Sequence, residues 1–334
     1  MKKGAIFRES DLKILIGGPG FMVEEYVKIV RRRFPDLKIL PSPVLVETET
    51  NQVQGELEDV DIIAAFNAYP YSMPRMKHLK WFQILMTGYE HVLKTGLITD
   101  NTILTNCSGT VSIPIAETVI AYLLFLVKKF RQSLENQKAH KMDRMLGQLR
   151  ELQNRTIGIL GLGHIGKVVA RKAKLGFDME VLGYDKYVTE YEFADRIYPF
   201  EKLDEVLKAC DFVVITLPLT NETEGLIGER ELRLMKDSAY LVNVARGEIL
   251  DKAAFTRALK EQWIAGAAID VFWGDPTAYS LPAEDDLWDL DNIFITAHNA
   301  TGTDRYVTRT GEMFCDNLAR FLKGEPLLNT INER

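Results

Sequence analysis

Residues 156–166 read Thr-Ile-Gly-Ile-Leu-Gly-Leu-Gly-His-Ile-Gly, and the fold is decided here. The first five residues are mostly apolar, too short for a helix and bounded by glycine, which predicts a buried strand of a parallel sheet. Three glycines follow with the spacing of a dinucleotide-binding turn. Gly161 permits the tight turn, Gly163 lets a pyrophosphate approach the backbone, and Gly166 lets the next helix pack close to the strand.

The residues after this turn complete the pattern. Residues 167–174 have helical apolar spacing, and 181–184 form a second strand that ends at Asp185. The free N–H groups of the helix N-terminus favour the phosphates. Asp185 lies 19 residues beyond Gly166, the separation at which an acid reaches the adenine ribose hydroxyls. Because a carboxylate there repels a 2′-phosphate, the sequence predicts NAD in preference to NADP.

A second glycine-rich turn lies near the N-terminus. Residues 12–20 also form a strand that runs into glycines, but the third glycine of the motif is replaced by Val23. The residue 19 positions further on is Ser42 and not an acid. We therefore interpret this turn as a plain strand-to-helix connection in a second α/β unit.

Strands alternate with helical patterns along the whole chain, which indicates an α/β protein with doubly wound parallel sheets. At 334 residues, the length favours two domains. The first has expected strands at 12–16, 37–40, 61–66, 81–86 and 102–105. An apolar helix from Pro114 leads to the second, a nucleotide domain at 108–299, with further strands at 212–216, 240–244, 264–269 and 293–296. A final helix is expected at 303–323 and returns to the first domain.

Composition excludes several classes of function. The net charge of −6 offers no basic surface for nucleic acid. No signal peptide is expected, and the longest apolar run, residues 119–127, is too short to cross a bilayer. Cys107, Cys210 and Cys315 are widely spaced and show no ligand pattern. They predict a reducing, cytoplasmic location and no metal site.

Three polar residues follow the ends of predicted strands. Arg246, Asp270 and His298 come directly or soon after the strands at 240–244, 264–269 and 293–296. Ligands of such sheets bind beyond the carboxyl ends of the strands. A guanidinium there can hold a carboxylate in a planar fork and polarise the adjacent carbonyl. An imidazole can pass the proton that accompanies hydride transfer. The pattern predicts hydride transfer between a nicotinamide and a small hydroxy or keto acid.

Longer motifs resemble a known family, the D-isomer-specific 2-hydroxyacid dehydrogenases. They are GLGHIG with Asp185, LPLTNET (217–223), NVARGEILD (243–251), GAAIDVFWGDP (266–276) and ITAHNATGT (295–303). The likeness extends from the segment at 86–89 to the one at 321–324. The separations of 29 residues from Arg246 to Asp275, and of 23 from Asp275 to His298, also match the family.

The resemblance implies a particular architecture. A Rossmann-type NAD domain at 108–299 is inserted into a flavodoxin-like substrate domain, which is split between 1–107 and 300–334. It also implies a homodimer formed through the NAD domains, with the helix at 114–130 contributing.

The resemblance further implies roles for individual residues. Arg246 would bind the substrate carboxylate and carbonyl, His298 would act as acid and base, and Asp275 would be its partner. Backbone N–H groups around Thr87 and Gly88 would bind the carboxylate. The expected cofactor-binding residues are Gly161, Gly163, His164, Ile165, Gly166, Asp185, Pro218, Thr223, Val244, Ala245, Arg246, Asp270 and His298. Separately, Tyr69 follows a strand end in the first domain, and it is a candidate for contact with the substrate side chain.

Two positions depart from the family. The partner of the histidine is usually glutamate, whereas Asp275 is one methylene shorter, and Ala297 stands where a proline usually precedes the histidine. Contact between Asp275 and His298 would then need a shift or a bridging water.

Other functions remain to be distinguished. A corepressor of the same fold would sense NAD(H) without turnover, and a weakly active paralogue would show little of it. A formate dehydrogenase would be expected to carry glutamine in place of Asp275, and a phosphite dehydrogenase lysine in place of Thr87, so the sequence argues against both. Among 2-keto acids, glyoxylate, pyruvate, a branched keto acid and a phenylpyruvate all remain open.

Overall fold

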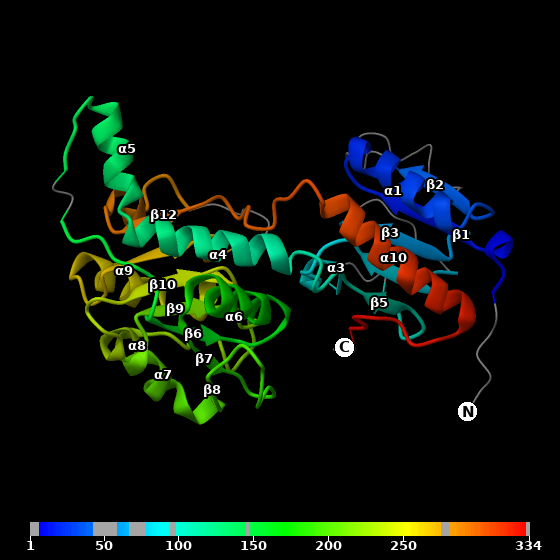
Figure 1. Ribbon diagram of the computed structural model, residues 1–334. Helices are drawn as coiled ribbons and strands as arrows, with labels where there is room; N and C mark the ends of the chain where they lie inside the picture. Colours follow the sequence, from blue (N-terminus) through cyan, green and yellow to red (C-terminus); the bar gives the residue numbers. More distant parts are fainter. Residues whose placement is uncertain are drawn as a thin grey trace. The chain divides into compact units, whose positions relative to one another are not determined.

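The computed structural model describes residues 7–42, 59–66, 78–93, 98–144, 147–274 and 281–331 (Figure 1). The chain divides into two compact units. One, called here the split unit, comprises residues 1–110 and 303–334, and the other, the central unit, comprises residues 111–302. The boundaries expected from the sequence, 107/108 and 299/300, lie three residues from these.

The described part of the central unit contains a parallel sheet of seven strands in the order β12-β11-β10-β9-β6-β7-β8. Their bounds are β6 Thr156–Leu160, β7 Glu180–Tyr184, β8 Arg196–Tyr198, β9 Phe212–Ile215, β10 Tyr240–Asn243, β11 Gly266–Ile269 and β12 Ile293–Ile295. The strand β6 is central and pairs with both β7 and β9. The strand order reverses there, so the crevice between β6 and β9 is the position at which such sheets bind ligands.

Helices cover both faces of this sheet (Figure 1). The helices of this unit are α4 Ser112–Val127, α5 Phe130–Lys138, α6 His164–Phe177, α7 Leu203–Ala209, α8 Glu229–Leu234 and α9 Lys252–Lys260, of which α5 extends away from the sheet. The helices α4 and α6 pack together on one face, whereas α7, α8 and α9 lie on the other. Because both faces are covered, the strands are almost wholly apolar and buried.

The split unit has a second parallel sheet, with the order β2-β1-β3-β4-β5 among its described residues. Its strands are β1 Lys13–Gly17, β2 Lys38–Ser42, β3 Ile62–Ala65, β4 Trp81–Ile84 and β5 Ile103–Thr105. Its helices are α1 Gly20–Arg33, α3 Glu90–Leu93 and α10 Tyr306–Lys323. The helix α10 packs beside α1 and joins the two sequence segments of the unit. This is the flavodoxin strand order.

These two sheets confirm the predicted fold class and most of the predicted strands. The strand β8 was missed because it has only three residues at the sheet edge, of which only Tyr198 is buried. The helix α4 begins at Ser112, two residues before the expected Pro114, because proline is tolerated in the first turn of a helix.

Within the described residues, no helix is both long and apolar enough to cross a membrane.

The glycine-rich turn sets how closely α6 lies against β6. A Cβ atom added at Gly166 would lie 1.9 Å from the carbonyl oxygen of Gly161. The helix can therefore begin at this distance from the strand only without a side chain at position 166. By contrast, a Cβ at Gly176, in the last turn of the same helix, meets nothing within 4 Å.

We predict that Gly166→Ala destabilises the central unit, because α6 must move away from the strand. The expected loss is about 1–3 kcal/mol in the free energy of unfolding. The matched control Gly176→Ala is expected to be neutral or to stabilise by up to about 1 kcal/mol, because alanine favours the helix. Denaturant unfolding of the three proteins measures both effects. Equal stability of the two variants would contradict the close approach.

Candidate active site

The turn between β6 and α6 has the geometry that the sequence predicts. Gly161 has a φ of 100°, in the region that favours glycine. A Cβ there would lie 2.9 Å from backbone atoms of Thr216 and Leu217, beside the end of β9. A Cβ at Gly163 would meet nothing within 4 Å, and no side chain caps the first turn of α6. Open space over a helix N-terminus suits a pyrophosphate, so these residues fit a dinucleotide.

Asp185 follows β7 and is tied to this turn. One carboxylate oxygen, Oδ2, accepts a hydrogen bond of 2.7 Å from the backbone N–H of Leu162. The other, Oδ1, accepts from the N–H groups of Tyr187 and Val188 at 2.8 and 2.9 Å. The neighbouring Lys186 forms an ion pair with Glu222. The acid is therefore held beside the glycines, and a carboxylate can accept about one more hydrogen bond.

The loop at 218–223 follows β9, the strand next to β6. The Thr223 hydroxyl donates to the Pro218 carbonyl at 2.6 Å and accepts from the N–H of Thr220 at 2.8 Å. Thr223 is buried, and its hydroxyl closes the loop on itself. The expected cofactor-binding positions Pro218 and Thr223 thus lie in a well-defined loop beside the glycine-rich turn.

Arg246 lies on a turn that Asn243 shapes. Asn243, the last residue of β10, is fully buried. Its side-chain amide donates to the carbonyl of Arg246 at 2.8 Å, and its Oδ1 accepts from the N–H of Ala245 at 3.0 Å. At Gly247 a Cβ would lie 2.3 Å from the backbone of Phe272, which follows β11. The arginine turn is therefore packed against the segment after the next strand.

Asp270, directly after β11, is the buried charge of the site. It is 2% exposed, and its carboxylate accepts from the N–H groups of Asn299 and Ala300 at 3.0 and 2.9 Å. The Thr296 hydroxyl also donates to it, at 2.5 Å. Hydrogen bonds from amides and hydroxyls stabilise the ionised form of a buried carboxyl group.

Tyr122 of α4 extends this network. Its hydroxyl bonds Thr296 Oγ1 and lies 3.5 Å from Asp270 Oδ1. Since the hydrogen of Thr296 goes to Asp270, the Tyr122 hydroxyl is the donor to Thr296. Burial raises the pKa of Tyr122, which keeps this donor protonated.

His298 lies in the turn that Asp270 holds. Its φ is 52°, a left-handed value that few residues other than glycine adopt. The two residues that follow it bind the Asp270 carboxylate, so this carboxylate holds the turn in place. Burial is the largest influence on the histidine and lowers its pKa below the ordinary value of 6.5. The charge of Asp270 raises this pKa and the charge of Arg246 lowers it.

The structure thus brings together three of the predicted site residues: Arg246, Asp270 and His298. They follow β10, β11 and β12, which are neighbours in the sheet. Asp275 and Tyr69 lie outside the described residues. Thr87 and Gly88 lie in the split unit, after β4. Of the remaining expected cofactor positions, His164 and Ile165 begin α6 after β6, and Val244 and Ala245 follow β10.

Sequence reasoning missed the residues that hold these groups in place. Asn243, Thr296 and Tyr122 were not identified. Asn243 gave a signal, since a polar amide ends an otherwise apolar strand. Tyr122 gave none, because it lies within the apolar run at 119–127 and reaches Asp270 from 148 positions away in the sequence.

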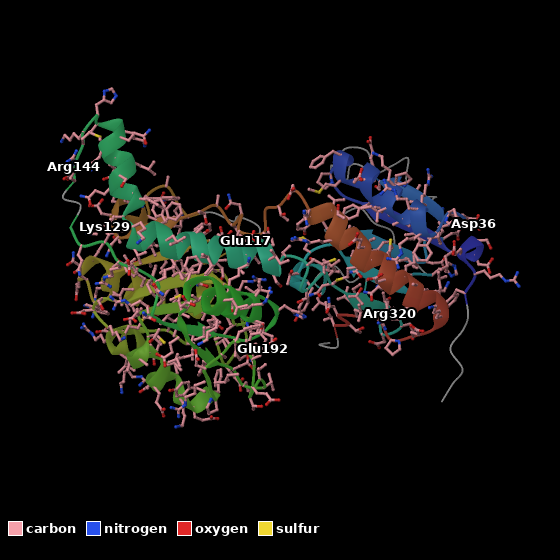
Figure 2. All side chains as sticks on the ribbon, viewed as in Figure 1. Asp36, Glu117, Lys129, Arg144, Glu192 and Arg320 are labelled. Atoms are coloured by element: carbon pink, nitrogen blue, oxygen red, sulfur yellow. The ribbon has the colours of Figure 1, made fainter. Side chains whose placement is uncertain are left out.

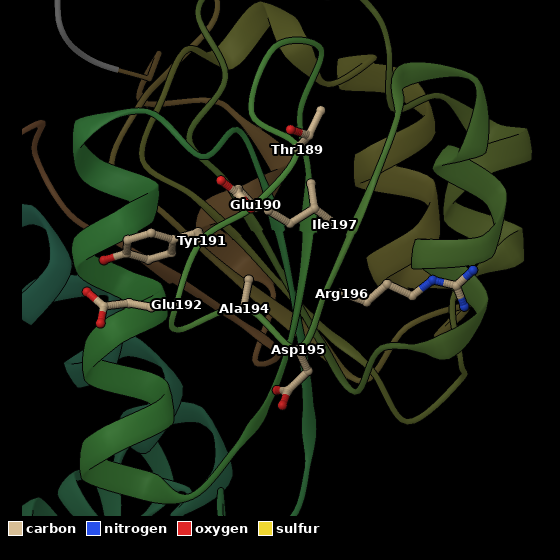
Figure 3. Close-up of a pocket in the computed structure, with 8 residues that line it drawn as sticks. All are labelled: Thr189, Glu190, Tyr191, Glu192, Ala194, Asp195, Arg196 and Ile197. Carbon is tan, nitrogen blue, oxygen red and sulfur yellow. The ribbon is translucent and has the colours of Figure 1, made fainter.

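A hollow of about 650 Å³ lies elsewhere in the central unit, at the segment that leads from β7 into β8 (Figure 3). Residues 189–192 and 194–197 line it, including Glu190, Glu192 and Asp195. It contains none of the predicted site residues, and its excess of carboxylates does not suit a pyrophosphate.

Among the described residues, no cluster of three or more His, Cys, Asp or Glu side chains could hold a metal ion.

Residues 120–300 match the family described as "D-isomer specific 2-hydroxyacid dehydrogenase, NAD binding domain". The chain belongs to this family. It is 41% identical over 189 residues to a glyoxylate reductase of Korarchaeum cryptofilum, covering 57% of this chain and 55% of that protein. The chain thus spans about half the length of that relative. A glyoxylate reductase of Thermofilum pendens is 33% identical over 260 residues, 76% of this chain and 75% of that protein.

A solved structure resembles the chain almost throughout. It is a D-isomer specific 2-hydroxyacid dehydrogenase family protein from Aeromonas salmonicida, 27% identical, with a TM-score of 0.83. The match covers 96% of this chain and 99% of that one. The likeness therefore includes the split unit as well as the central one.

We predict that Asp270→Asn lowers the pKa of His298 further, because the charge that raises it is removed. The measurement is the NMR titration of the His298 ring protons in the protein without ligands. Asp275→Asn is the comparison, since the resemblance makes Asp275 the partner of the histidine. A larger shift in Asp275→Asn than in Asp270→Asn would assign the dominant charge to Asp275.

Proposed function

We propose that this protein is an NAD-dependent oxidoreductase, which transfers a hydride between NAD(H) and a small 2-keto or 2-hydroxy acid of the D configuration. The observation that carries the proposal is the grouping of Arg246, Asp270 and His298 at neighbouring strand ends. The strands that carry these residues belong to the same sheet as β6, which leads into the glycine-rich turn that fits a dinucleotide. Membership of the family supports the same reaction class.

Each residue has a role in this proposal. The bound nicotinamide supplies or accepts the hydride. Arg246 holds the substrate carboxylate and polarises the carbonyl oxygen, which a planar guanidinium can do with paired donors. In reduction, protonated His298 donates its proton to the oxygen that becomes the hydroxyl, and in oxidation the neutral imidazole accepts it. Asp270 favours the protonated histidine and would hold the carboxamide side of a nicotinamide, and Asp275 would act as the histidine's partner.

The split unit supplies the remaining substrate contacts. Backbone N–H groups of Thr87 and Gly88 bind the substrate carboxylate, and Tyr69 contacts its substituent. The cofactor is bound by Gly161, Gly163, His164, Ile165, Gly166, Asp185, Pro218, Thr223, Val244, Ala245, Arg246, Asp270 and His298.

Local charge supports NAD as the preferred cofactor. Asp185 would accept a hydrogen bond from the adenine ribose and repel a 2′-phosphate. Lys186, the nearest cation in the sequence, is already paired with Glu222. The three side chains carry a net charge of −1, which disfavours the additional phosphate of NADP.

We predict turnover of NADH with at least one of glyoxylate, pyruvate, a branched 2-keto acid and phenylpyruvate. NADH should be preferred over NADPH by about 10-fold or more in kcat/KM, the effect of one charged hydrogen bond. Arg246→Lys should lower kcat/KM for the keto acid by about 10-fold or more, because lysine lacks the planar fork. The loss of dihydronicotinamide absorbance during cofactor oxidation measures all three of these quantities.

The matched control is Arg150→Lys. Arg150 donates to the carbonyl of Ser238 at 2.5 Å, outside the candidate site, and its exchange should leave kcat/KM unchanged. Binding of NADH without oxidation by any of the four keto acids would favour a nucleotide-sensing protein. Equal activity of Arg246→Lys and the parent would reject the role of Arg246.

We also propose that two copies associate through their central units. Large apolar side chains are exposed on α5 and after it: Phe130 is 47% exposed, Leu134 50% and Met142 95%. The helix α5 extends away from the sheet of the central unit, between the labelled Lys129 and Arg144 (Figures 1 and 2). Exposed apolar groups on a projecting segment mark a protein–protein contact, and a second copy of the chain is the partner that we propose.

We predict that the protein has twice the mass of a single chain in solution. The double variant Phe130→Glu/Leu134→Glu should have the mass of a single chain. Light scattering with size-exclusion chromatography measures the mass. Phe21→Glu is the control, because Phe21 is 74% exposed but lies in the split unit. A monomeric parent protein would contradict the proposal, and so would a dimer that tolerates both glutamates.

A further inference from the structure

The turn after β4, residues 85–88, is held by its carbonyl groups. The Tyr306 hydroxyl donates to the carbonyl of Leu85 at 2.7 Å. The N–H of Cys107 donates to the carbonyl of Met86 at 2.9 Å. The side-chain amide of Asn106 donates to the carbonyl of Thr87 at 2.7 Å. Three consecutive carbonyl oxygens are therefore fixed by groups from two other segments of the split unit.

Fixing the carbonyls also fixes the N–H groups that follow them. A trans peptide unit is planar, so its N–H points opposite to its C=O. The Met86 carbonyl thereby directs the N–H of Thr87, and the Thr87 carbonyl directs the N–H of Gly88. Within the described residues, neither N–H has a hydrogen-bond partner. The Thr87 hydroxyl is also buried without a partner there. The turn thus presents donors without partners. One of them, the Thr87 hydroxyl, is buried, and buried donors are almost always paired.

Asn106 is itself held in a single orientation. Its Oδ1 accepts from the N–H of Ser108 at 3.1 Å, which leaves the amide nitrogen for Thr87. It is 7% exposed, so water does not compete freely for these groups.

The C-terminal segment supports Asn106 from the other side. The amide nitrogen of Asn329 donates to the carbonyls of Ser108 and Asn106 at 2.9 and 3.3 Å. Its carbonyl accepts from the N–H of Asn106 at 3.3 Å. The next residue, Thr330, forms an antiparallel bridge with Thr105 at the end of β5. Residues at the far end of the chain are thereby bonded to the segment that carries Asn106.

This C-terminal segment is anchored independently in the core. The fully buried Asn317 of α10 accepts from the N–H of Leu328 at 2.7 Å and donates to its carbonyl at 3.1 Å. Its amide nitrogen also donates to Gln83 of β4 at 3.0 Å. A chain of hydrogen bonds therefore runs from α10 through Asn329 and Asn106 to the turn at 85–88.

We propose that Asn106 and Asn329 are positioning residues, which direct the Gly88 N–H group toward the substrate carboxylate. The inference rests on the proposed function. Asn106 acts directly on the Thr87–Gly88 peptide, and Asn329 acts through Asn106. Neither side chain touches the substrate.

The first experiment compares kinetics. Asn106→Ala should raise the KM of the best keto acid by about 10-fold or more, since a misdirected N–H loses its bond to a charged group. The KM of NADH and the thermal midpoint should stay close to the parent values. Asn106→Asp keeps an acceptor for Ser108 but has no donor for Thr87, so it should be impaired at least as much.

Asn329 requires a variant that does not strain the backbone. Its φ is 55°, which glycine adopts freely. Asn329→Gly therefore removes the amide alone and should raise the keto acid KM in the same direction but less, by about 3- to 10-fold. In the double variant with Asn106→Ala, the exchange at 329 should add little, because both residues act through one contact. Asn292→Ala is the matched control, since it removes an asparagine bond of 3.0 Å to the Leu259 carbonyl in the central unit.

A second measurement does not depend on turnover. Hydrogen exchange at Leu85 and Cys107, whose N–H groups bond on either side of the turn, should be faster in Asn106→Ala than in the parent and unchanged in Asn292→Ala. Binding of oxamate, an isostere of a 2-keto acid, to the NADH complex should weaken in parallel with the KM.

The outcomes separate the two proposals. A parent enzyme that reduces keto acids, with an unchanged KM in Asn106→Ala, would overturn the positioning role and leave the proposed function intact. Faster exchange in a protein without keto acid reduction would reject the proposed function. In that case, only the claim that Asn106 holds the turn at 85–88 would stand. Unchanged exchange at both amides would overturn the inference in either case.

Discussion

The close approach of α6 to β6 is the constraint on which the central unit depends. Only at this separation does the first turn of α6 begin directly beyond the strand, with its N–H groups over the glycines. A side chain at Gly166 would collide with the carbonyl oxygen of Gly161, and the helix would tilt or withdraw. The strands β7 and β9 flank β6, so the strand order reverses beside this turn. The placement of Asp185 beside Leu162 belongs to the same packing.

The reactive end of the site depends on a different interaction, the burial of the Asp270 charge. A carboxylate that is 2% exposed is stable only if hydrogen bonds replace its water. Four groups approach it, from Tyr122, Thr296, Asn299 and Ala300. Two of these are backbone N–H groups just after His298, so satisfying the acid also forms the left-handed turn at the histidine. The same hydrogen bonds therefore stabilise the Asp270 charge and place His298, the proposed proton-transfer group.

The pKa of His298 illustrates how opposing effects balance. Burial and the Arg246 guanidinium both favour the neutral imidazole, whereas Asp270 favours the charged one. A substrate carboxylate bound to Arg246 would cancel part of the arginine's effect. The histidine would then gain basicity when substrate is present, as an acid in ketone reduction requires. In the proposed reaction, Arg246 would therefore influence both substrate binding and proton transfer.

Local patterns in the sequence were enough to predict the fold class, nearly all strands, the glycine-rich turn with Asp185, and the strand-end positions of Arg246, Asp270 and His298. Each of these is encoded within a few residues, as apolar periodicity, obligatory glycine or a polar residue after a strand. Contacts between distant segments were decided by the tertiary structure alone. Tyr122 reaches Asp270 from within an apolar helix, and Asn329 reaches Asn106 across 223 positions. No local periodicity encodes such pairs, because a hydrogen bond between buried polar groups depends on where the folded chain brings them together.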